Sequence, residues 1–237
     1  MTAVGDVPKK VRSTREDLAS SMIDKPDPLA IVLEGRLNTY RHYAKRRKEV
    51  GDRFICDIMA DSSFAYNDDG KVIWYSSIYG LTSALDFMAL FLDSKHPNCV
   101  ILIGSCGLDR KISRKTAVIP RIASQEMLDL RGTADEALMN IATKVAESSG
   151  LDVVVTDKHV SKFSFVRSPG EERGESEDLE AASVYNMANS YGVPVVAILG
   201  VSDYRSDGYI YYVEYEEELK DDVFAIASKT LRGFRKS

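Results

Sequence analysis

A nine-residue apolar run near the C-terminal end, VPVVAILGV at 193–201, constrains the fold more than any other stretch. Its residues are aliphatic and mostly β-branched, interrupted only by Pro194 and Gly200. Such runs are typical of strands that are covered on both faces of a parallel sheet. The sequence therefore predicts an α/β protein, with a single domain in which helices flank a central mixed β-sheet.

Two carboxylates stand next to this strand. Asp203 follows Ser202 at the carboxyl end of the run, where ligands bind in sheets of this kind. Glu180 lies near the start of the helix predicted to precede the strand, behind acidic residues at 175, 177 and 178, where the helix dipole favours negative charge. Glu180 and Asp203 are therefore a candidate catalytic pair.

Hydrophobic periodicity and turn residues divide the rest of the chain. Polar, proline-punctuated residues 1–28 are expected to form a loosely attached arm, and 29–237 the folded domain. Residues 104–107 are expected to form a glycine turn, 67–70 a hairpin turn, 158–173 a loop or edge strand, and 171–177 a mobile acidic connection. Strands are predicted at 29–33, 54–65, 71–77, 99–103, 117–123 and 153–156, and helices at 37–47, 82–92, 135–150 and 217–234.

Composition excludes several classes of protein. The net charge of −5 gives no general attraction to nucleic-acid phosphates, and no apolar stretch approaches the length of a membrane span. No secretory signal is visible, so we expect a soluble, cytoplasmic protein. Cys56, Cys99 and Cys106 lack metal-binding spacing and are expected to be reduced core thiols. No metal and no cofactor is predicted.

Two blocks of sequence stand out as motifs: VILIGSCG at 100–107 with KISRKTAVIP at 111–120, and DLEAA at 178–182 with GVSD at 200–203. These blocks resemble the nucleoside phosphorylase, uridine phosphorylase and nucleosidase family, and they stand in the family's order and at about its separation, so the resemblance covers 29–231. It implies an enzyme that cleaves the N-glycosidic bond of a nucleoside, by hydrolysis or by glycosyl transfer to phosphate.

The resemblance assigns roles to the two carboxylates. Cleavage of a C1'–N bond builds positive charge on the ribose and negative charge on the departing base. An ionised Glu180 suits the ribose, because it accepts hydrogen bonds from both hydroxyls of the 2',3'-diol. Asp203 suits the base, as a purine proton donor, if its pKa is raised enough to keep it protonated. The ordinary alternatives are a helix N-terminal acid for Glu180 and a turn former for Asp203.

Two further residues match family positions around the substrate, and two phenylalanines are candidates for contact with the base. Leu179 and Tyr79 correspond to residues beside the sugar, and Phe163 or Phe165 is expected to stack on the base, since a flat apolar ring suits a heterocycle. All four are equally compatible with ordinary packing roles.

The phosphate-binding residues of the family are incomplete. Its early loop survives only as Gly35 followed by Arg36, and Leu102 stands where an arginine is usual. Thr39 stands near the place of the nucleosidases' water-activating glutamate. The backbone amides and the hydroxyl at Ser105 remain as hydrogen-bond donors for an anion. Further candidates for the missing charge are Arg36, Arg41 and, from a neighbouring subunit, Lys48.

Three functions therefore stay open. The first is cleavage of a nucleoside by water or phosphate. The second is cleavage of a nucleotide whose 5'-phosphate is held by the basic cluster at 36–48. The third is a non-catalytic nucleoside-binding protein, against which the presence of both Glu180 and Asp203 argues. In this family a residue from a neighbouring subunit commonly completes the site, so the resemblance predicts a homo-oligomer, either a dimer or a hexamer.

Overall fold

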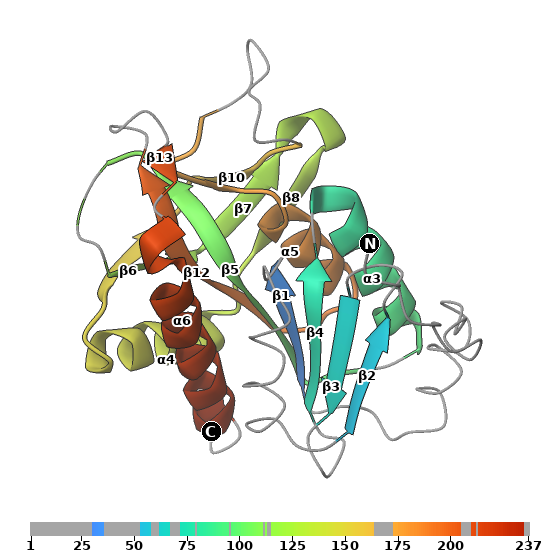
Figure 1. Cartoon of the computed structure of the whole chain (residues 1–237). Helices are drawn as coiled ribbons and strands as arrows, with labels where there is room; N and C mark the ends of the chain where they lie inside the picture. Colours follow the sequence, from blue (N-terminus) through green and yellow to red (C-terminus); the bar gives the residue numbers. More distant parts are fainter. Residues whose placement is uncertain are drawn as a thin grey trace, which may run out of the picture.

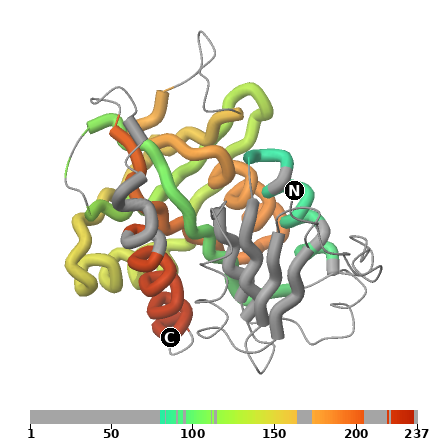
Figure 2. Tube along the Cα trace, in the orientation of Figure 1, coloured from blue at the N-terminus to red at the C-terminus, as the bar shows by residue number. Residues whose placement is uncertain are grey.

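The fold was analysed in a computed structural model. It describes residues 30–35, 53–57, 62–66, 72–78, 80–94, 96–110, 112, 115–163, 173–204, 210–211 and 213–234. The first four of these ranges are described by their backbone. Figure 2 draws in grey the segments whose placement is uncertain.

The described strands pair into one continuous sheet of thirteen strands. At its centre, β1 pairs in parallel with β4 and β5, and β5 pairs in parallel with β12. Antiparallel strands extend both sides, which makes the sheet mixed and confirms the predicted fold class. The strands are β1 Ala30–Gly35, β2 Arg53–Asp57, β3 Ser62–Tyr66, β4 Val72–Ile78, β5 Cys99–Leu108, β6 Thr116–Pro120, β7 Ile122–Gln125, β8 Leu130–Thr133, β9 Asp152–Thr156, β10 His159–Ser161, β11 Ser176–Asp178, β12 Val195–Tyr204 and β13 Ile210–Tyr211.

Helices cover both faces of the sheet (Figure 1). Helices α3 and α5 pack together against one face, and α4 and α6 lie side by side against the other. Their bounds are α3 Gly80–Ser94, α4 Glu136–Ser148, α5 Ala181–Ser190 and α6 Val213–Phe234, with a 3-10 turn η1 at Glu126–Leu128. These bounds confirm the helices predicted at 82–92, 135–150 and 217–234.

Side chains along β5 and β12 alternate between the two helical layers. In β5, Val100 and Leu102 belong to the core under α3 and α5, whereas Ile101 and Ile103 belong to the core under α4 and α6. This alternation follows from the two-residue period of a strand. It explains why the run at 193–201 is apolar throughout, because neither face of β12 meets water.

Two predicted strands are each two strands in the structure. Residues 54–65 form β2 and β3, which pair antiparallel with each other, and 117–123 form β6 and β7, separated by Arg121. One polar residue such as Arg121 changes an apolar pattern very little, so the pattern does not show that the strand breaks there. The hairpin pairing of β3 with β4 is confirmed.

Three expectations for loops are wrong. Residues 104–107 continue β5 as a strand, because β12 pairs alongside them as far as Leu108. Residues 159–161 form β10, which lies between β7 and β11 rather than at an edge. Residues 176–178, expected in a helix and in a mobile acidic connection, form the buried strand β11 instead.

Several predictions fall outside the described residues. They concern the arm at 1–28, the helix at 37–47 and the turn at 67–70. The division into an arm and one domain stays a prediction. Within the described residues, no helix combines the length and apolar character needed to cross a membrane, and no group of three or more His, Cys, Asp or Glu side chains is arranged for a metal ion.

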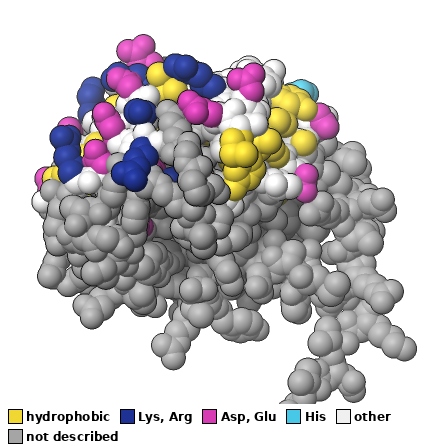
Figure 3. Space-filling view, turned by 90° about the horizontal axis from the view of Figure 1, so that it is seen from above, with side chains coloured by type: hydrophobic (Ala, Val, Ile, Leu, Met, Phe, Trp, Pro, Cys, Tyr) yellow, Lys and Arg dark blue, Asp and Glu magenta, His cyan; other side chains and the backbone are white. Residues whose placement is uncertain are grey.

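Cys99 and Cys106 are buried free thiols, as predicted. Seen from above, basic and acidic side chains are interspersed over the described surface, and hydrophobic side chains gather toward one side of it (Figure 3). The charge of this described area is therefore mixed rather than uniformly basic.

Candidate active site

The carboxyl ends of the central parallel strands lie together at one edge of the sheet. Gly35 at the end of β1 pairs with Ile78 at the end of β4, and Glu34 pairs with Ile103 of β5. Helix α3 begins two residues after β4, at Gly80. Its backbone N–H donates a 2.7 Å hydrogen bond to Glu180 Oε1, which joins the start of α5 to this edge.

Glu180 occupies the N-cap position of α5 and is partly buried. The pKa of Glu180 is raised to about 8, mainly by burial and also by the negative charge of Asp178, against the lowering effect of the backbone N–H groups of Gly80 and Leu179. The Glu180 carboxyl by itself is therefore mainly protonated at pH 7. Two hydroxyl donors from a ligand would favour its ionised form.

Asp203 is placed by an irregularity in β12. Val201 pairs with Cys106 of β5, but the next pair is Asp203 with Gly107, so Ser202 is an extra residue in a β-bulge. A bulge of one residue moves the following side chain to the opposite face of the sheet. Without it, Asp203 would face the buried layer under α5 that contains Val201.

Gly107 provides the space that the Asp203 side chain occupies. A Cβ atom at Gly107 would lie 2.7 Å from Asp203 Oδ2, closer than such atoms approach in proteins. On the other side of Gly107, β11 places Glu177 opposite the same residue. Glu177 pairs with Lys162, and both residues are less than a tenth exposed. This ion pair therefore lies across β5 from Asp203.

The surroundings of Asp203 favour its protonated form. Burial raises the pKa of Asp203, and the negative charge of Glu177 raises it further, while the hydroxyl of Ser202 and the charge of Lys162 lower it. Ser202 Oγ donates a 2.8 Å hydrogen bond to Asp203 Oδ1. A partly buried carboxyl with a raised pKa at a strand end has the properties of a proton donor.

The thiol of Cys106, the residue before Gly107, is unreactive. Burial raises the pKa of Cys106 well above its usual value, and the charges of Asp178 and Asp203 raise it further. The Cys106 thiol is therefore protonated at neutral pH and is a poor nucleophile.

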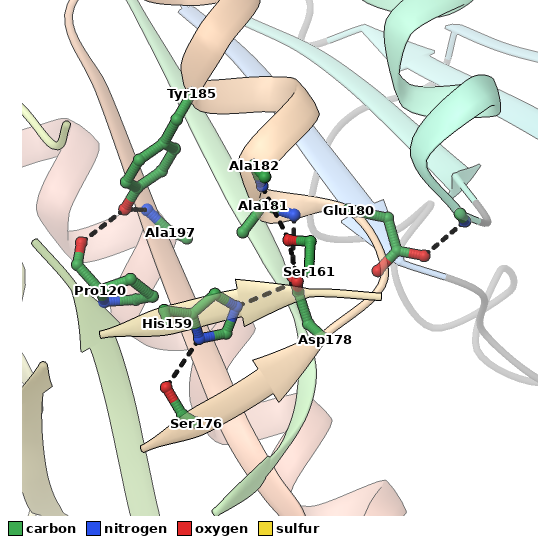
Figure 4. A network of polar contacts seen from close by, with 11 residues as sticks. Pro120, His159, Ser161, Ser176, Asp178, Glu180, Ala181, Ala182, Tyr185 and Ala197 are labelled. Atoms are coloured by element: carbon green, nitrogen blue, oxygen red, sulfur yellow. Dashed lines mark hydrogen bonds and ion pairs between the residues drawn. The ribbon is translucent and has the colours of Figure 1, made fainter. Parts of the chain in front are cut away.

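A buried polar cluster of His159, Ser161, Ser176 and Asp178 supports the start of α5 (Figure 4). His159 Nδ1 lies 2.7 Å from Ser176 Oγ, and its Nε2 lies 3.0 Å from Asp178 Oδ1 without forming a well-aligned hydrogen bond. Ser161 Oγ donates to the same Asp178 oxygen. Sequence reasoning missed the roles of all four residues, because their partners come from strands 17 residues apart.

Tyr185, about one turn further along α5, fixes the helix to the sheet. Its hydroxyl donates to the carbonyl of Pro120 in β6 and accepts from the N–H of Ala197 in β12, both at 2.8 Å. Burial raises the pKa of Tyr185 well above its usual value, so this hydroxyl keeps its proton. The helix that carries Glu180 is thus tied to two strands through one side chain.

The remaining predicted site residues are only partly described. Leu179 is buried beside Glu180, and Phe163, which follows β10, is 47% exposed. Gly35 ends β1, and Ser105 is partly buried in β5. The other predicted site residues lie outside the described part of the chain: Tyr79, Phe165, Arg36, Arg41 and Lys48.

The expected anion cradle at 104–107 takes a different form from a glycine turn. These residues form a strand, paired on one side with β12. On the other side, β1 pairs with β5 only as far as Ile103, and β11 pairs with Gly107 and Leu108. Among the described strands, the backbone around Ser105 therefore has no pairing strand on this side, and its contact with an anion or a sugar oxygen stays a prediction.

Leu102 is 1% exposed and packs in the core under α3 and α5. An aliphatic side chain here adds to the hydrophobic core and contributes no charge to the strand ends. Leu102 is therefore a core residue and cannot supply the charge that the resemblance expects from an arginine at this position.

No protein-family model matches this sequence, and no curated protein is significantly similar to it. Solved structures are similar in three dimensions. The 5'-methylthioadenosine/S-adenosyl homocysteine nucleosidase of Campylobacter jejuni has 15% sequence identity and a TM-score of 0.69, over 88% of this chain and 100% of that chain. AMP nucleosidase from Bacteroides thetaiotaomicron VPI-5482 has 16% identity and a TM-score of 0.68, over 94% and 98%.

The chain has the fold of these nucleosidases. The resemblance found in the motifs at 100–120 and 178–203 is confirmed at the level of the fold. At 15% and 16% identity, the chemistry has to be argued from this chain's own residues.

Proposed function

We propose that this protein cleaves the N-glycosidic bond of a nucleoside, with a purine as the expected base. The observation that carries the proposal is the placement of Asp203, which a one-residue bulge turns over Gly107 at the strand ends, with a raised pKa. Glu180 stands at the same edge of the sheet, bonded to the start of α3. The similarity to two nucleosidases supports this class of reaction.

In this mechanism the two carboxyl groups act on opposite ends of the breaking bond. The protonated Asp203 donates its proton to the purine ring as negative charge builds there. Glu180 accepts hydrogen bonds from the ribose 2'- and 3'-hydroxyls, which lower its pKa so that it releases its proton to solvent and its charge lies near the growing positive charge of the sugar. The C1'–N bonding electrons leave with the base, the nucleophile bonds to C1', and an attacking water gives up one proton to bulk solvent.

We infer that the nucleophile is water rather than phosphate. Orthophosphate carries about two negative charges at neutral pH and needs several donors to leave bulk water. Leu102 is a core residue, so one expected arginine contact is absent. The C. jejuni and B. thetaiotaomicron structures are both nucleosidases, which agrees with hydrolysis.

A nucleotide substrate is the second candidate. AMP nucleosidase from B. thetaiotaomicron matches 94% of this chain, somewhat more than the other similar structure. The basic cluster at 36–48, which includes Arg36, Arg41 and Lys48, would then bind a 5'-phosphate.

We further propose a soluble homo-oligomer in which Lys48 of one subunit reaches its neighbour's site. Sedimentation at micromolar concentration tests the assembly. A dimer or hexamer is expected, and a monomer would contradict it.

The function is tested by incubating the purified protein with a panel of purine and pyrimidine nucleosides and their 5'-monophosphates, with and without phosphate. Free base and sugar products are measured by chromatography. Release of a free purine with ribose or ribose 5-phosphate is expected. If no member of the panel yields free base, the proposed function is wrong.

A further inference from the structure

Helix α5 begins at a residue whose side chain does not cap it. Glu180 holds the N-cap position, with φ −131° and ψ −34°, yet its carboxylate makes no hydrogen bond to the helix. The first backbone N–H groups of a helix have no partner within it, and the N-cap side chain usually accepts from one of the next two or three. In this helix the acceptors for those N–H groups come from elsewhere.

Two buried side chains supply them. Asp178 Oδ2 accepts from the N–H of Ala181 at 2.9 Å, and Ser161 Oγ accepts from the N–H of Ala182 at 2.8 Å. The Ser161 hydroxyl proton is directed to Asp178 Oδ1, which leaves its oxygen lone pairs for Ala182. Figure 4 shows the Glu180 carboxylate pointing away from this cluster, toward the N–H at the start of α3.

We propose that Ser161 and Asp178 are positioning residues that cap α5 in place of Glu180 and thereby keep its carboxylate available for the sugar. This inference rests on the proposed function, in which Glu180 binds the ribose diol. His159 lies beside the same carboxylate, with its Nε2 3.0 Å from Asp178 Oδ1 and its Nδ1 2.7 Å from Ser176 Oγ.

Without the Ser161 oxygen, we expect the Glu180 side chain to take a different conformation. The N–H of Ala182 is the second of the helix, which is the group that an N-cap side chain ordinarily engages. Ala182 is fully buried, so loss of the Ser161 oxygen would leave this donor without an acceptor in a dry environment. The Glu180 carboxylate is the nearest side chain in sequence that can turn back to satisfy it. Doing so would withdraw it from Gly80 and from a bound sugar.

The test compares a purine ribonucleoside with its 2'-deoxy analogue, which lacks one of the two hydroxyls assigned to Glu180. The ratio of the two kcat/KM values measures how well Glu180 binds the diol. In Ser161→Ala we expect this ratio to fall about tenfold, mainly through a higher KM for the ribonucleoside. Ser190→Ala, at the other end of α5, is the matched control, because its hydroxyl is exposed and bonds Asn186 O. It should keep the wild-type ratio.

Two further variants separate positioning from general damage to the fold. Ser161→Cys keeps the side-chain volume but replaces a good acceptor with a weak one, so it should also lower the ratio even if Ser161→Ala folds poorly. In a Glu180→Gln background, Ser161→Ala should lower the ratio no further, because both changes act on the same contact.

The outcomes distinguish this inference from the proposed function. If the Ser161 variants keep the wild-type ratio, or Ser161→Ala lowers kcat/KM for both substrates equally, the inference is wrong while the function stands. If wild type cleaves no nucleoside, or Glu180→Gln keeps the wild-type ratio, the role proposed for Glu180 fails, and the inference fails with it.

Discussion

Glu180 and Asp203 reach the same edge of the sheet through different local structures. Glu180 stands at a helix start, where the carboxylate of Asp178 and the hydroxyl of Ser161 accept from the first N–H groups of the helix. Asp203 stands in a strand, turned by a bulge onto a glycine, with the Lys162–Glu177 ion pair across β5. Burial is the largest cause of the raised pKa of each group, but the neighbouring charges differ.

The difference indicates that the two halves of the site can be damaged separately. Changes at β12 or Gly107 should affect protonation of the base, whereas changes at the start of α5 should affect binding of the sugar. If a substitution at one of these places impaired protonation of the base and binding of the sugar equally, the site would not be divided in this way.

Asp203→Asn is expected to have the largest effect. An amide keeps the shape of the side chain but has no acidic proton, so kcat on a purine nucleoside should fall by about 10³-fold while KM changes little. Steady-state kinetics measure both constants. Asp157→Asn, which alters an exposed carboxylate paired with Arg121, is the control and should be neutral. Wild-type turnover in Asp203→Asn would rule out its role as the acid.

Gly107→Ala is expected to have the next largest effect, because the new Cβ would displace the Asp203 carboxylate that lies 2.7 Å away. We expect a loss of about 10²-fold in kcat, without a further loss when Asp203→Asn is also present. Gly104→Ala is the matched control in the same strand, since its Cβ would meet only Leu199 at 3.6 Å. Equal losses in the two alanine variants would contradict this account of Gly107.

Phosphate should have a smaller effect on the rate. With Leu102 in the core, we expect base release to persist in phosphate-free buffer and added phosphate to raise the rate less than about tenfold, or roughly 1.4 kcal/mol in barrier. Chromatography of the sugar product provides the measurement. A rate that falls to background without phosphate, with ribose 1-phosphate as the sole sugar product, would show that Arg36, Arg41 or a neighbour's Lys48 restores the site.

Glu180→Gln should change stability in a pH-dependent way. Because the pKa of Glu180 rises from 4.5 in the unfolded chain to about 8 in the fold, wild type loses stability as pH rises between these values, and the glutamine variant does not. The variant should therefore gain on the order of 5 kcal/mol relative to wild type between pH 4 and pH 9, because each pH unit between 4.5 and 8 contributes about 1.4 kcal/mol. Urea unfolding at the two pH values measures this, with exposed Glu147→Gln as the control. An unchanged difference would mean that Glu180 is not desolvated.

Sequence patterns predicted the layers of the fold but not the face on which Asp203 lies. Apolar runs report burial directly, so the strand at 193–201 and the helices at 82–92, 135–150 and 217–234 were found from the residues alone. The bulge at Ser202 depends on how β12 pairs with β5 around Gly107, and no local pattern reports that pairing.

The acidic residues before Glu180 were misinterpreted for a related reason. Acidic side chains are typical of the first turn of a helix, so Glu177 and Asp178 were assigned to one. In the structure both are buried in β11. Glu177 pairs with Lys162, which directly follows β10, and Asp178 accepts a hydrogen bond from Ser161, the last residue of β10. These partners lie 15 and 17 residues away, in a segment whose own pattern predicted only a loop or edge strand.

The most direct test of the division between the two carboxylates uses p-nitrophenyl β-D-riboside beside a purine nucleoside. Nitrophenolate leaves readily without protonation, so this substrate needs the sugar half of the site but no acid. We expect Asp203→Asn to lose about 10³-fold in kcat on the purine nucleoside and less than about tenfold on the nitrophenyl riboside, whereas Glu180→Gln should lose similar factors on both. Equal losses on both substrates in Asp203→Asn would contradict the account.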